Sequence, residues 1–523
     1  MRMRLVVFIF PLLASCIAAT VSIRPSDQVA IVSSGSGTSV FDLRGRALAD
    51  AQAVSGVDSL DASPNQRNLR QHSDVVIGKG DFVLRATVVM DEMSSRGAGI
   101  SFDGGGVNLD DREWGVVLTG RLFGGGRFPF ETQRPPSARP GAPIEIEIRR
   151  SDGSLSVSIN EFEMGRIGMS GFEIGRIGFD LAAGNMRVLE CSAEGDLSRF
   201  PLPRAAFSSA DGDIDEYRDP SVASDGARAL VTAIAVRTAD DGTTRETLAG
   251  RFVERDGRLA EVNEIDLGGA SVELAVLGYA NGDPRPWKLL LQEPCGKRIA
   301  DHLTVFDSPD GRRFSKVTRL DASASPVRLL SGAMSESGGA LVASATTARG
   351  GVPRAAAVQF TSKAGWELRE LTDEPSCEPQ WIGQDRSMVR KPGALDRQLL
   401  ADGTKSPISG FDAGPTAFAL ISVATGNTRV ACSDGGFPYP LQELISRDLG
   451  SNWTKGRTIW GGSASNACSA TAEGRRIVVF EGGDKARREH ILVLRLTDSD
   501  ANPPLNQPST AGTAATIEPQ LKP

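Results

Sequence analysis

The sequence predicts an all-β protein, and three observations lead to this prediction. Glycine and proline are abundant, at 58 and 29 of 523 residues, and both interrupt helices and favour turns. Runs of β-branched residues are short and are broken by Gly, Asp and Pro, which is typical of strands joined by turns. Long stretches with the period of a helix are hard to find. A chain of this length exceeds one hydrophobic core, so we expect two or three domains.

Composition excludes some classes of function. The net charge is −7 and the pI is about 5.4, so the protein lacks the basic field that would neutralise phosphates, and we expect no nucleic-acid partner. The three histidines are scattered and no C-x-x-C spacing occurs. We therefore expect no metal site built from His and Cys and no cofactor, although Asp-rich turns leave room for structural calcium. We expect a monomer.

The first 21 residues have the features of an export signal. Arg2 and Arg4 precede the apolar run 5–13, which is too short to span a bilayer as a helix. Residues 13–16 read Leu-Ala-Ser-Cys and match a bacterial lipobox, so Cys16 is a candidate for lipidation. The alternative is ordinary cleavage near Ala18 or Ala19. Both interpretations predict export. The first predicts a periplasmic or cell-surface lipoprotein that its lipid holds at the membrane, and the second predicts a secreted protein.

Five further cysteines follow, namely Cys191, Cys295, Cys377, Cys432 and Cys468. An exported protein can oxidise them, but an odd number leaves at least one without a partner inside the chain.

A polar segment, 22–74, leads into a predicted β-sandwich over 75–198. Residues 81–89 have the pattern of a strand, and 144–149 alternate apolar and charged residues, as in a sheet with one wet face. Ser151-Asp152-Gly153 is a turn signal, and 155–159 returns as the partner strand. With the Gly-rich loop 120–126 and the strand that follows 174, this order resembles the concanavalin-like (LamG-like) jelly roll. That resemblance implies either carbohydrate binding or a spacer that packs on the next domain.

Residues 199–497 hold repeated short strands, and the tail 498–523, rich in Pro, Asn, Thr and Ala, is predicted to be disordered. Examples of the strands are 231–236, 287–291, 341–344, 417–423, 477–480 and 491–496. Six blades of about 50 residues, each a four-stranded sheet, would fill this region.

An eight-residue turn pattern, S-x-D-x-G-x-x-W, occurs at 446–453. The Asp of such a turn accepts hydrogen bonds from nearby backbone N–H groups, Gly supplies a positive φ, and Trp buries apolar area under the turn. Its fixed positions are Ser446, Asp448, Gly450 and Trp453. A shortened copy consists of Ser308, Asp310, Gly311 and Phe314.

This pattern is the Asp-box (BNR repeat), and the chain resembles the sialidase superfamily, whose Asp-boxes lie on the blades of a six-bladed β-propeller. The resemblance implies a glycan ligand at the central face. It also implies an exo-glycosidase (glycoside hydrolase) acting on terminal, including acidic, sugars.

The resemblance points to a binding arginine. Sialidases open blade one with Arg-Ile-Pro, whose Arg binds the substrate carboxylate; here Arg218-Asp219-Pro220 stands at that place. A guanidinium can donate two parallel hydrogen bonds to a carboxylate. Asp219 replaces the expected Ile, so Arg218 could instead form a local ion pair.

The catalytic set is incomplete. No Tyr occurs in 466–471, where the resemblance expects the nucleophile. Glu378 and Asp219 are candidate catalytic carboxylates, and Tyr439 could line the pocket or only pack beside its prolines. Arg390 or Arg397, together with Arg429, could complete an arginine cluster.

Two alternatives stay open. The first is a non-catalytic carbohydrate- or protein-binding propeller whose catalytic set has decayed. The second is a five-bladed glycosidase that uses two carboxylates, because Arg218-Asp219-Pro220 and Cys377-Glu378-Pro379 loosely match the Arg-Asp-Pro and Glu-Cys segments of that group.

Overall fold

The regular elements of the computed structural model are all β-strands in the residues that it describes. The described residues are 30–33, 39–42, 58–62, 69–90, 98–103, 105–110, 115–120, 126–130, 135–169, 174–181, 184–201, 203–208, 214–294, 300–330, 332–337, 339–383, 386–392, 397–401, 404–410, 418–424, 427–433, 440–460, 463–483 and 490–496. The predicted signal peptide with Cys16, the tail from 498 and Tyr439 lie outside these residues. No helix in the described ranges is long and apolar enough to cross a membrane.

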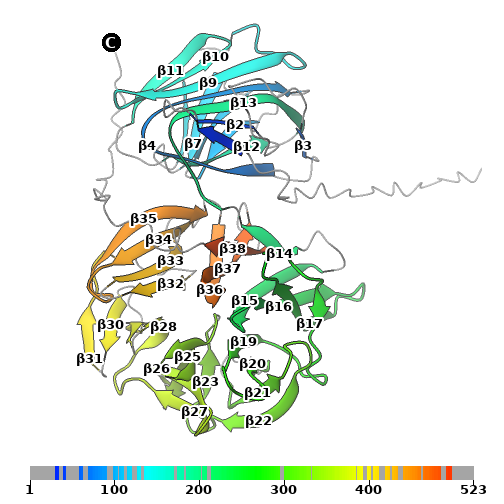
Figure 1. Ribbon diagram of the computed structural model, residues 1–523, viewed down its shortest axis with the longest axis vertical. Coiled ribbons are helices and arrows are strands. Elements are labelled where there is room, and N and C mark those ends of the chain that lie inside the picture. The colour runs from blue at the N-terminus through cyan, green and yellow to red at the C-terminus, as the bar shows by residue number, and fades with distance from the viewer. Residues whose placement is uncertain are drawn as a thin grey trace, which may run out of the picture.

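The N-terminal domain is a single sheet of eleven strands that wraps one hydrophobic core (Figure 1). The longest strand, β4 (Leu69–Met90), pairs with β12 (Gly175–Leu181) through its first half and with β9 (Pro143–Ser151) through its second half. β9 and β10 (Ser154–Ile159) form the hairpin that the sequence predicts. The other strands are β3 (Asp58–Ala62), β5 (Ala98–Phe102), β6 (Gly105–Asp110), β7 (Gly115–Gly120), β8 (Gly126–Pro129), β11 (Phe162–Gly168) and β13 (Gly184–Arg199); β1 (Ala30–Ser33) and β2 (Ser39–Asp42) form a separate hairpin.

The C-terminal domain is a six-bladed β-propeller. Six sheets follow one another along the chain and stand around one axis (Figure 1). Blade 1 consists of β15 (Glu216–Ser224), β16 (Ala229–Thr238), β17 (Thr244–Val253) and β18 (Asn263–Glu264). Blade 2 consists of β19 (Leu274–Tyr279), β20 (Trp287–Gln292), β21 (His302–Ser308) and β22 (Ser315–Asp321). Blade 3 consists of β23 (Val327–Leu329), β24 (Ser335–Ser337), β25 (Ala340–Arg349), β26 (Val352–Thr361) and β27 (Gly365–Glu370). Blade 4 consists of β28 (Cys377–Gly383), β29 (Arg386–Arg390), β30 (Arg397–Ala401) and β31 (Thr404–Pro407). Blade 5 consists of β32 (Phe418–Ala424), β33 (Asn427–Ser433), β34 (Leu441–Ser446) and β35 (Trp453–Trp460). The six-bladed prediction is confirmed, and the five-bladed alternative is wrong.

The last blade closes the ring with a strand from the start of the domain. β36 (Ser463–Ala472), β37 (Arg475–Gly483) and β38 (His490–Leu496) take β14 (Arg204–Ser208) as their outermost strand. The pairing of β14 with β38 covers an edge that would otherwise carry free backbone groups, and it joins the two ends of the propeller.

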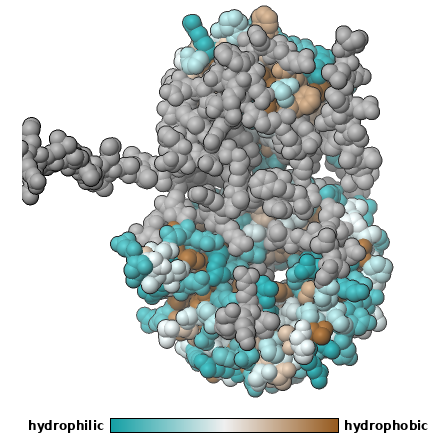
Figure 2. All heavy atoms as spheres, turned by 180° about the vertical axis from the view of Figure 1, so that it is seen from behind, coloured by the Kyte–Doolittle hydropathy of each residue, from teal (hydrophilic) through white to brown (hydrophobic). Residues whose placement is uncertain are grey.

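Apolar side chains between neighbouring blades hold the ring together. Separate clusters of buried residues join blades 1 and 2, blades 2 and 3, blades 5 and 6, and blades 6 and 1. Because each blade packs its faces on its neighbours, the innermost strands are left around a shared axial space. Figure 2 shows only scattered hydrophobic residues on the described surface of one face of the propeller.

The turn at 446–453 is held by its own side chains. Ser446 Oγ donates to Asp448 Oδ1 at 2.8 Å, and the same oxygen of Asp448 accepts from the backbone N–H of Asn452 at 2.8 Å. Gly450 has φ 100° and Trp453 is buried, with its Nε1–H donating to the carbonyl of Gly450 at 2.8 Å. The turn at 308–314 is similar, because Ser308 Oγ donates to Asp310 Oδ1 at 3.0 Å, Gly311 has φ 74° and Phe314 is buried.

One arginine joins the two domains. Arg176 on β12 has no exposed surface. Its guanidinium donates to the carbonyl of Ile459 on blade 5 and to that of Pro201 at 2.7 Å. The guanidinium also lies over the ring of Phe200, at 4.9 Å from the ring centre, and Arg457 of blade 5 lies over the same ring at 4.1 Å.

Candidate functional site

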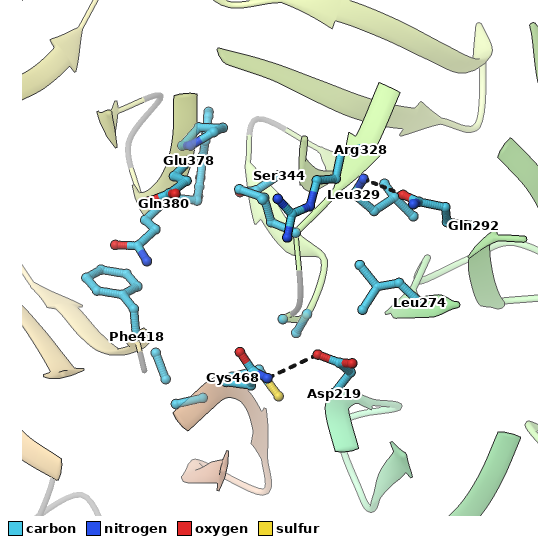
Figure 3. A pocket seen from close by; sticks show the side chains of 18 of the residues that line it. Asp219, Leu274, Gln292, Arg328, Leu329, Ser344, Glu378, Gln380, Phe418 and Cys468 are labelled. Carbon is cyan, nitrogen blue, oxygen red and sulfur yellow. Dashed lines mark hydrogen bonds between the residues drawn. The ribbon is translucent and has the colours of Figure 1, made fainter. Parts of the chain in front are cut away.

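A cavity of about 940 Å³ occupies the axis of the propeller, and residues of all six blades line it (Figure 3). Its lining includes Glu216, Arg218, Asp219 and Glu246 of blade 1; Glu273 and Gln292 of blade 2; Arg328 and Ser344 of blade 3; Glu378, Gln380, Trp381 and Arg397 of blade 4; Phe418 of blade 5; and Asn466 and Cys468 of blade 6. The volume of this cavity is at the upper end of the range for pockets that bind small molecules.

Three blades point a planar polar side chain into this cavity by the same backbone device. Asp219, Glu378 and Asn466 have φ of 51°, 51° and 45°, a left-handed conformation that residues other than glycine seldom adopt. Each lies in a β-bulge of an innermost strand, where the pairing register shifts between residues 218 and 221, 377 and 380, and 465 and 468. Such strain costs about 1–3 kcal/mol per residue and clusters at functional sites.

Arg218 is already paired by carboxylates. It forms ion pairs with Asp219 at 2.5 Å and with Glu246 at 2.8 Å, and it donates to the carbonyl of Glu273 at 3.1 Å. Burial acts to lower the pKa of Arg218, but the hydrogen bonds and charges of Glu246 and Asp219 raise that pKa above its usual value. The local ion pair considered from the sequence is therefore present, and this guanidinium has little capacity left for a ligand carboxylate.

A hydrogen-bond network crosses the seam between blades 6 and 1. Asn466 Nδ2 donates to Asp219 Oδ1 at 3.0 Å and to Glu481 Oε1 at 2.9 Å. Glu481 is buried and also accepts from the backbone N–H of Asp219 at 2.6 Å and from Ser465 Oγ at 2.6 Å. The buried carboxylate thus orients two of the three polar side chains that face the cavity.

Glu378 on blade 4 is held by two arginines. Its carboxylate pairs with Arg390 at 2.5 Å and with Arg397 at 3.7 Å, and its backbone N–H donates to Thr346 Oγ1 at 3.2 Å. Burial lowers the pKa of Arg397, and the charge of Glu378 opposes that shift. Both Asp219 and Glu378 therefore lie beside arginines that hold their carboxylates in place.

Arg328 differs from the other cavity arginines. It is exposed on β23 and points into the cavity (Figure 3), and its guanidinium forms no ion pair or hydrogen bond with any residue in the described part of the chain. It is thus a positive charge available to a ligand.

Cys468 also lines the cavity, but its sulfur is not an activated nucleophile. Burial raises the pKa of Cys468 far above its usual value, so the thiol stays protonated at neutral pH. In the described residues, Cys191, Cys377, Cys432 and Cys468 form no disulfide; Cys295 lies outside them. No group of His, Cys, Asp and Glu side chains in the described residues is arranged to hold a metal ion.

Comparison with known proteins finds likeness in structure only. No family model matches the sequence, and no curated protein is similar to it in sequence. The chain is similar to Penicillium chrysogenum α-L-arabinanase complexed with arabinobiose, at 12% identity and a TM-score of 0.42 over 58% of this chain and 99% of that one. It is similar to Trypanosoma rangeli sialidase in complex with the inhibitor DANA, at 14% identity and a TM-score of 0.39 over 54% of this chain and 55% of that one. It is also similar to a neuraminidase-like protein of A/little yellow-shouldered bat/Guatemala, at 11% identity and a TM-score of 0.38 over 57% of this chain and 96% of that one.

The structure places some of the predicted site residues in the cavity and others outside it. Arg218, Asp219 and Glu378 line the cavity. Arg390 reaches it only through Glu378. Arg429 does not line it: this residue lies on the second strand of blade 5 and pairs with the buried Glu443 at 2.8 Å. The expected arginine cluster in the cavity therefore does not include Arg429, because its guanidinium pairs with Glu443 instead of lining the cavity.

The tyrosines that the structure describes lie elsewhere. Tyr217 is buried against Phe207, with ring centres 5.1 Å apart, and Tyr279 packs against Trp287 at 5.0 Å. Neither lines the cavity, and Tyr439 lies outside the described residues.

The sequence did not predict some of the residues that line the cavity. A shared pattern could have indicated Asn466, because each bulge has an acidic or amide residue followed by Pro or Ala. The three segments are Arg218-Asp219-Pro220-Ser221, Cys377-Glu378-Pro379-Gln380 and Ser465-Asn466-Ala467-Cys468. Nothing in the local sequence marks Arg328, Gln380 or Phe418.

Proposed function

We propose that this protein is an exported β-propeller that binds a glycan in its axial cavity. The observation that carries the proposal is the set of three side chains, Asp219, Glu378 and Asn466, which left-handed bulges aim into one cavity from three blades. Sugar hydroxyls both donate and accept hydrogen bonds, and carboxylate and amide groups held in fixed positions match them at a small entropic cost. The signal-like N-terminus with Cys16 supports export.

Recognition is favoured over hydrolysis by the surroundings of the carboxylates. A glycosidase needs a carboxyl group that can approach the glycosidic oxygen and give it a proton. Asp219 and Glu378 each form an ion pair with an arginine at 2.5 Å, so both carboxylates already have a charged partner. The described lining also contains no tyrosine that could act as the nucleophile of a sialidase.

Hydrolysis is the second candidate, and one observation favours it. Asp219 and Glu378 belong to blades 1 and 4, which are opposite in a ring of six, so a glycosidic bond could lie between two carboxylates. Displacement of Arg390 by a bound sugar would free the Glu378 carboxyl group from its ion pair and let it contact the glycosidic oxygen.

The test combines binding and turnover. Purified protein is applied to a glycan array and to a panel of aryl glycosides and a fluorogenic sialoside, beside Asp219→Asn and Glu378→Gln. We expect array binding that both variants weaken, and no turnover. Turnover that both variants abolish would establish hydrolysis instead, and the absence of both binding and turnover would refute a glycan-directed function.

A further inference from the structure

The two sides of the axial cavity differ in chemistry. Blades 1 and 2 contribute mostly charged groups, namely Glu216, Arg218, Asp219, Glu246 and Glu273. Blades 4 and 5 contribute the aromatic rings of Trp381 and Phe418 and the amide of Gln380, beside Glu378 and Arg397. Figure 3 shows the Gln380 amide next to the Phe418 ring on one side of the cavity, with Asp219 on another.

Phe418 and Gln380 are placed to act together. They open the innermost part of neighbouring blades, on β32 and β28, and these strands contact each other. An aromatic ring has a negative face, which attracts the weakly positive C–H groups on the face of a sugar ring. An amide beside that ring can donate to and accept from hydroxyls at the edge of the same sugar.

Polar atoms in this wall also lack partners. Gln380 Oε1 and Trp381 Nε1 are buried without a hydrogen bond in the part of the chain that the structure describes. A buried polar group without a hydrogen bond is unfavourable, so a ligand that supplies the partner after a small side-chain rotation is bound more tightly.

The size of the cavity exceeds the needs of a single sugar. Its 940 Å³ compares with roughly 300–1,000 Å³ for pockets that enclose a whole drug-sized molecule, and a monosaccharide is smaller than such a molecule. Room therefore exists for one ring at the charged side and another at the aromatic side.

We infer that Phe418, Gln380 and Trp381 form a second sugar subsite, and that the ligand is an oligosaccharide of at least two rings. This inference rests on the proposed function. It adds that the aromatic subsite, and not the charged one, selects for chain length.

Isothermal titration calorimetry on the whole chain tests it. The probes are mono-, di- and trisaccharides in the arabinose, galactose, N-acetylglucosamine and N-acetylneuraminic acid series. The variants are Phe418→Leu, which keeps apolar volume but removes the aromatic face, Gln380→Ala, and Asp219→Asn. Phe360→Leu is the matched control, because that ring packs on Trp366 at 4.9 Å and lies outside the cavity lining.

We expect the disaccharide of one series to bind at least about tenfold more tightly than its monosaccharide, since stacking and apolar burial together supply about that factor. Phe418→Leu and Gln380→Ala should remove this gain, so that each variant binds the disaccharide about as tightly as the monosaccharide. Asp219→Asn should weaken both ligands equally. The inference is overturned if affinity does not rise with length, or if Phe418→Leu and Gln380→Ala leave the gain intact or weaken both ligands alike. Failure of every saccharide to bind wild-type protein refutes the proposed function itself, which is a different result.

Discussion

Asn466 donates a hydrogen bond from Nδ2 to Oδ1 of Asp219, 247 positions earlier in the chain, at 3.0 Å. This contact joins the innermost strands of the last and first blades, while β14 and β38 join the same region at the rim. The ring is thus closed twice, and the inner closure is made by two residues that face the cavity. Binding and ring closure share the same atoms, so substitutions at Asn466 affect both.

Asn466→Gly and Asn466→Ala should both weaken glycan binding and destabilise the ring, because each removes the amide that bonds to Asp219 and Glu481. The alanine variant should be the less stable of the two. Glycine adopts the φ of 45° freely, but alanine in the left-handed region costs about 1–2 kcal/mol. Thermal unfolding and the array assay check the pair. Equal stability of the two variants would contradict the assigned backbone conformation.

Glu481→Ala should destabilise the propeller by roughly 3 kcal/mol. The substitution leaves the Asp219 N–H and the Ser465 hydroxyl without their acceptor, and it removes one of the two acceptors of the Asn466 amide. Denaturant unfolding measures the loss. Glu367→Ala, an exposed residue on β27, is the control and should change stability by less than about 0.5 kcal/mol. A Glu481→Ala variant as stable as this control would show that the network contributes little.

Arg328→Ala should reduce the affinity for acidic glycans about tenfold and leave neutral glycans and stability almost unchanged. The reason is that this cavity guanidinium has no carboxylate partner in the described residues and is exposed, so an anionic ligand would gain a charge-assisted hydrogen bond. Array binding at two salt concentrations checks the effect. Arg319→Ala on the outer strand β22 is the control, and an equal loss there would assign the effect to overall charge.

Arg176→Ala should uncouple the two domains. Removal of the buried guanidinium leaves the carbonyls of Ile459 and Pro201 without donors and removes its contact with Phe200, a loss of roughly 3 kcal/mol. Calorimetry should then resolve separate unfolding transitions for the N-terminal domain and the propeller. Arg166→Ala removes an exposed ion pair on the same domain and should leave the profile unchanged; a variant of Arg176 that unfolds like wild type would show that the domains are coupled elsewhere.

The turn at 446–453 should stabilise the protein only above acidic pH. Burial acts to raise the pKa of Asp448, but hydrogen bonds from Asn452 and Ser446 hold that pKa below its usual value. A carboxyl with a lowered pKa stabilises the fold fully above its unfolded pKa, about 4, and loses this effect as the pH falls through the folded value. The melting temperature of Asp448→Ala should therefore lie below that of wild type at pH 7, and the gap should narrow towards pH 3. Asp240→Ala, at an exposed loop position, is the control for a surface substitution and should leave stability at pH 7 almost unchanged. A gap independent of pH would contradict the ionic role of Asp448.

Local patterns predicted a large part of this fold. The alternation of 144–149 and the turn at 151–153 predicted a hairpin because both depend on neighbours in the chain. The recurrence of short strands after 199 predicted blades, and the ring of six follows the same repeat. Asp219 and Glu378 were candidates because their segments, Arg218-Asp219-Pro220 and Cys377-Glu378-Pro379, loosely match segments of propeller glycosidases.

The remaining parts of the site could not be predicted in this way. Arg429 was expected in the cavity and instead pairs with the buried Glu443, since the sequence does not reveal which carboxylate a distant arginine will meet. Arg328 and Phe418 have ordinary neighbours along the chain, and they face the cavity only because their strands lie at the axis.

The sequence by itself determined an all-β chain, a repeat of four-stranded sheets and the acidic residues available for chemistry, because these depend on composition and on contacts between residues close in the chain. Only the tertiary structure decided which arginines form ion pairs and that Arg328 has no such partner among the described residues. It also placed Asn466 within hydrogen-bond distance of Asp219. The physical reason is that closing a ring of blades places residues hundreds of positions apart within hydrogen-bond distance, and no local pattern records that distance.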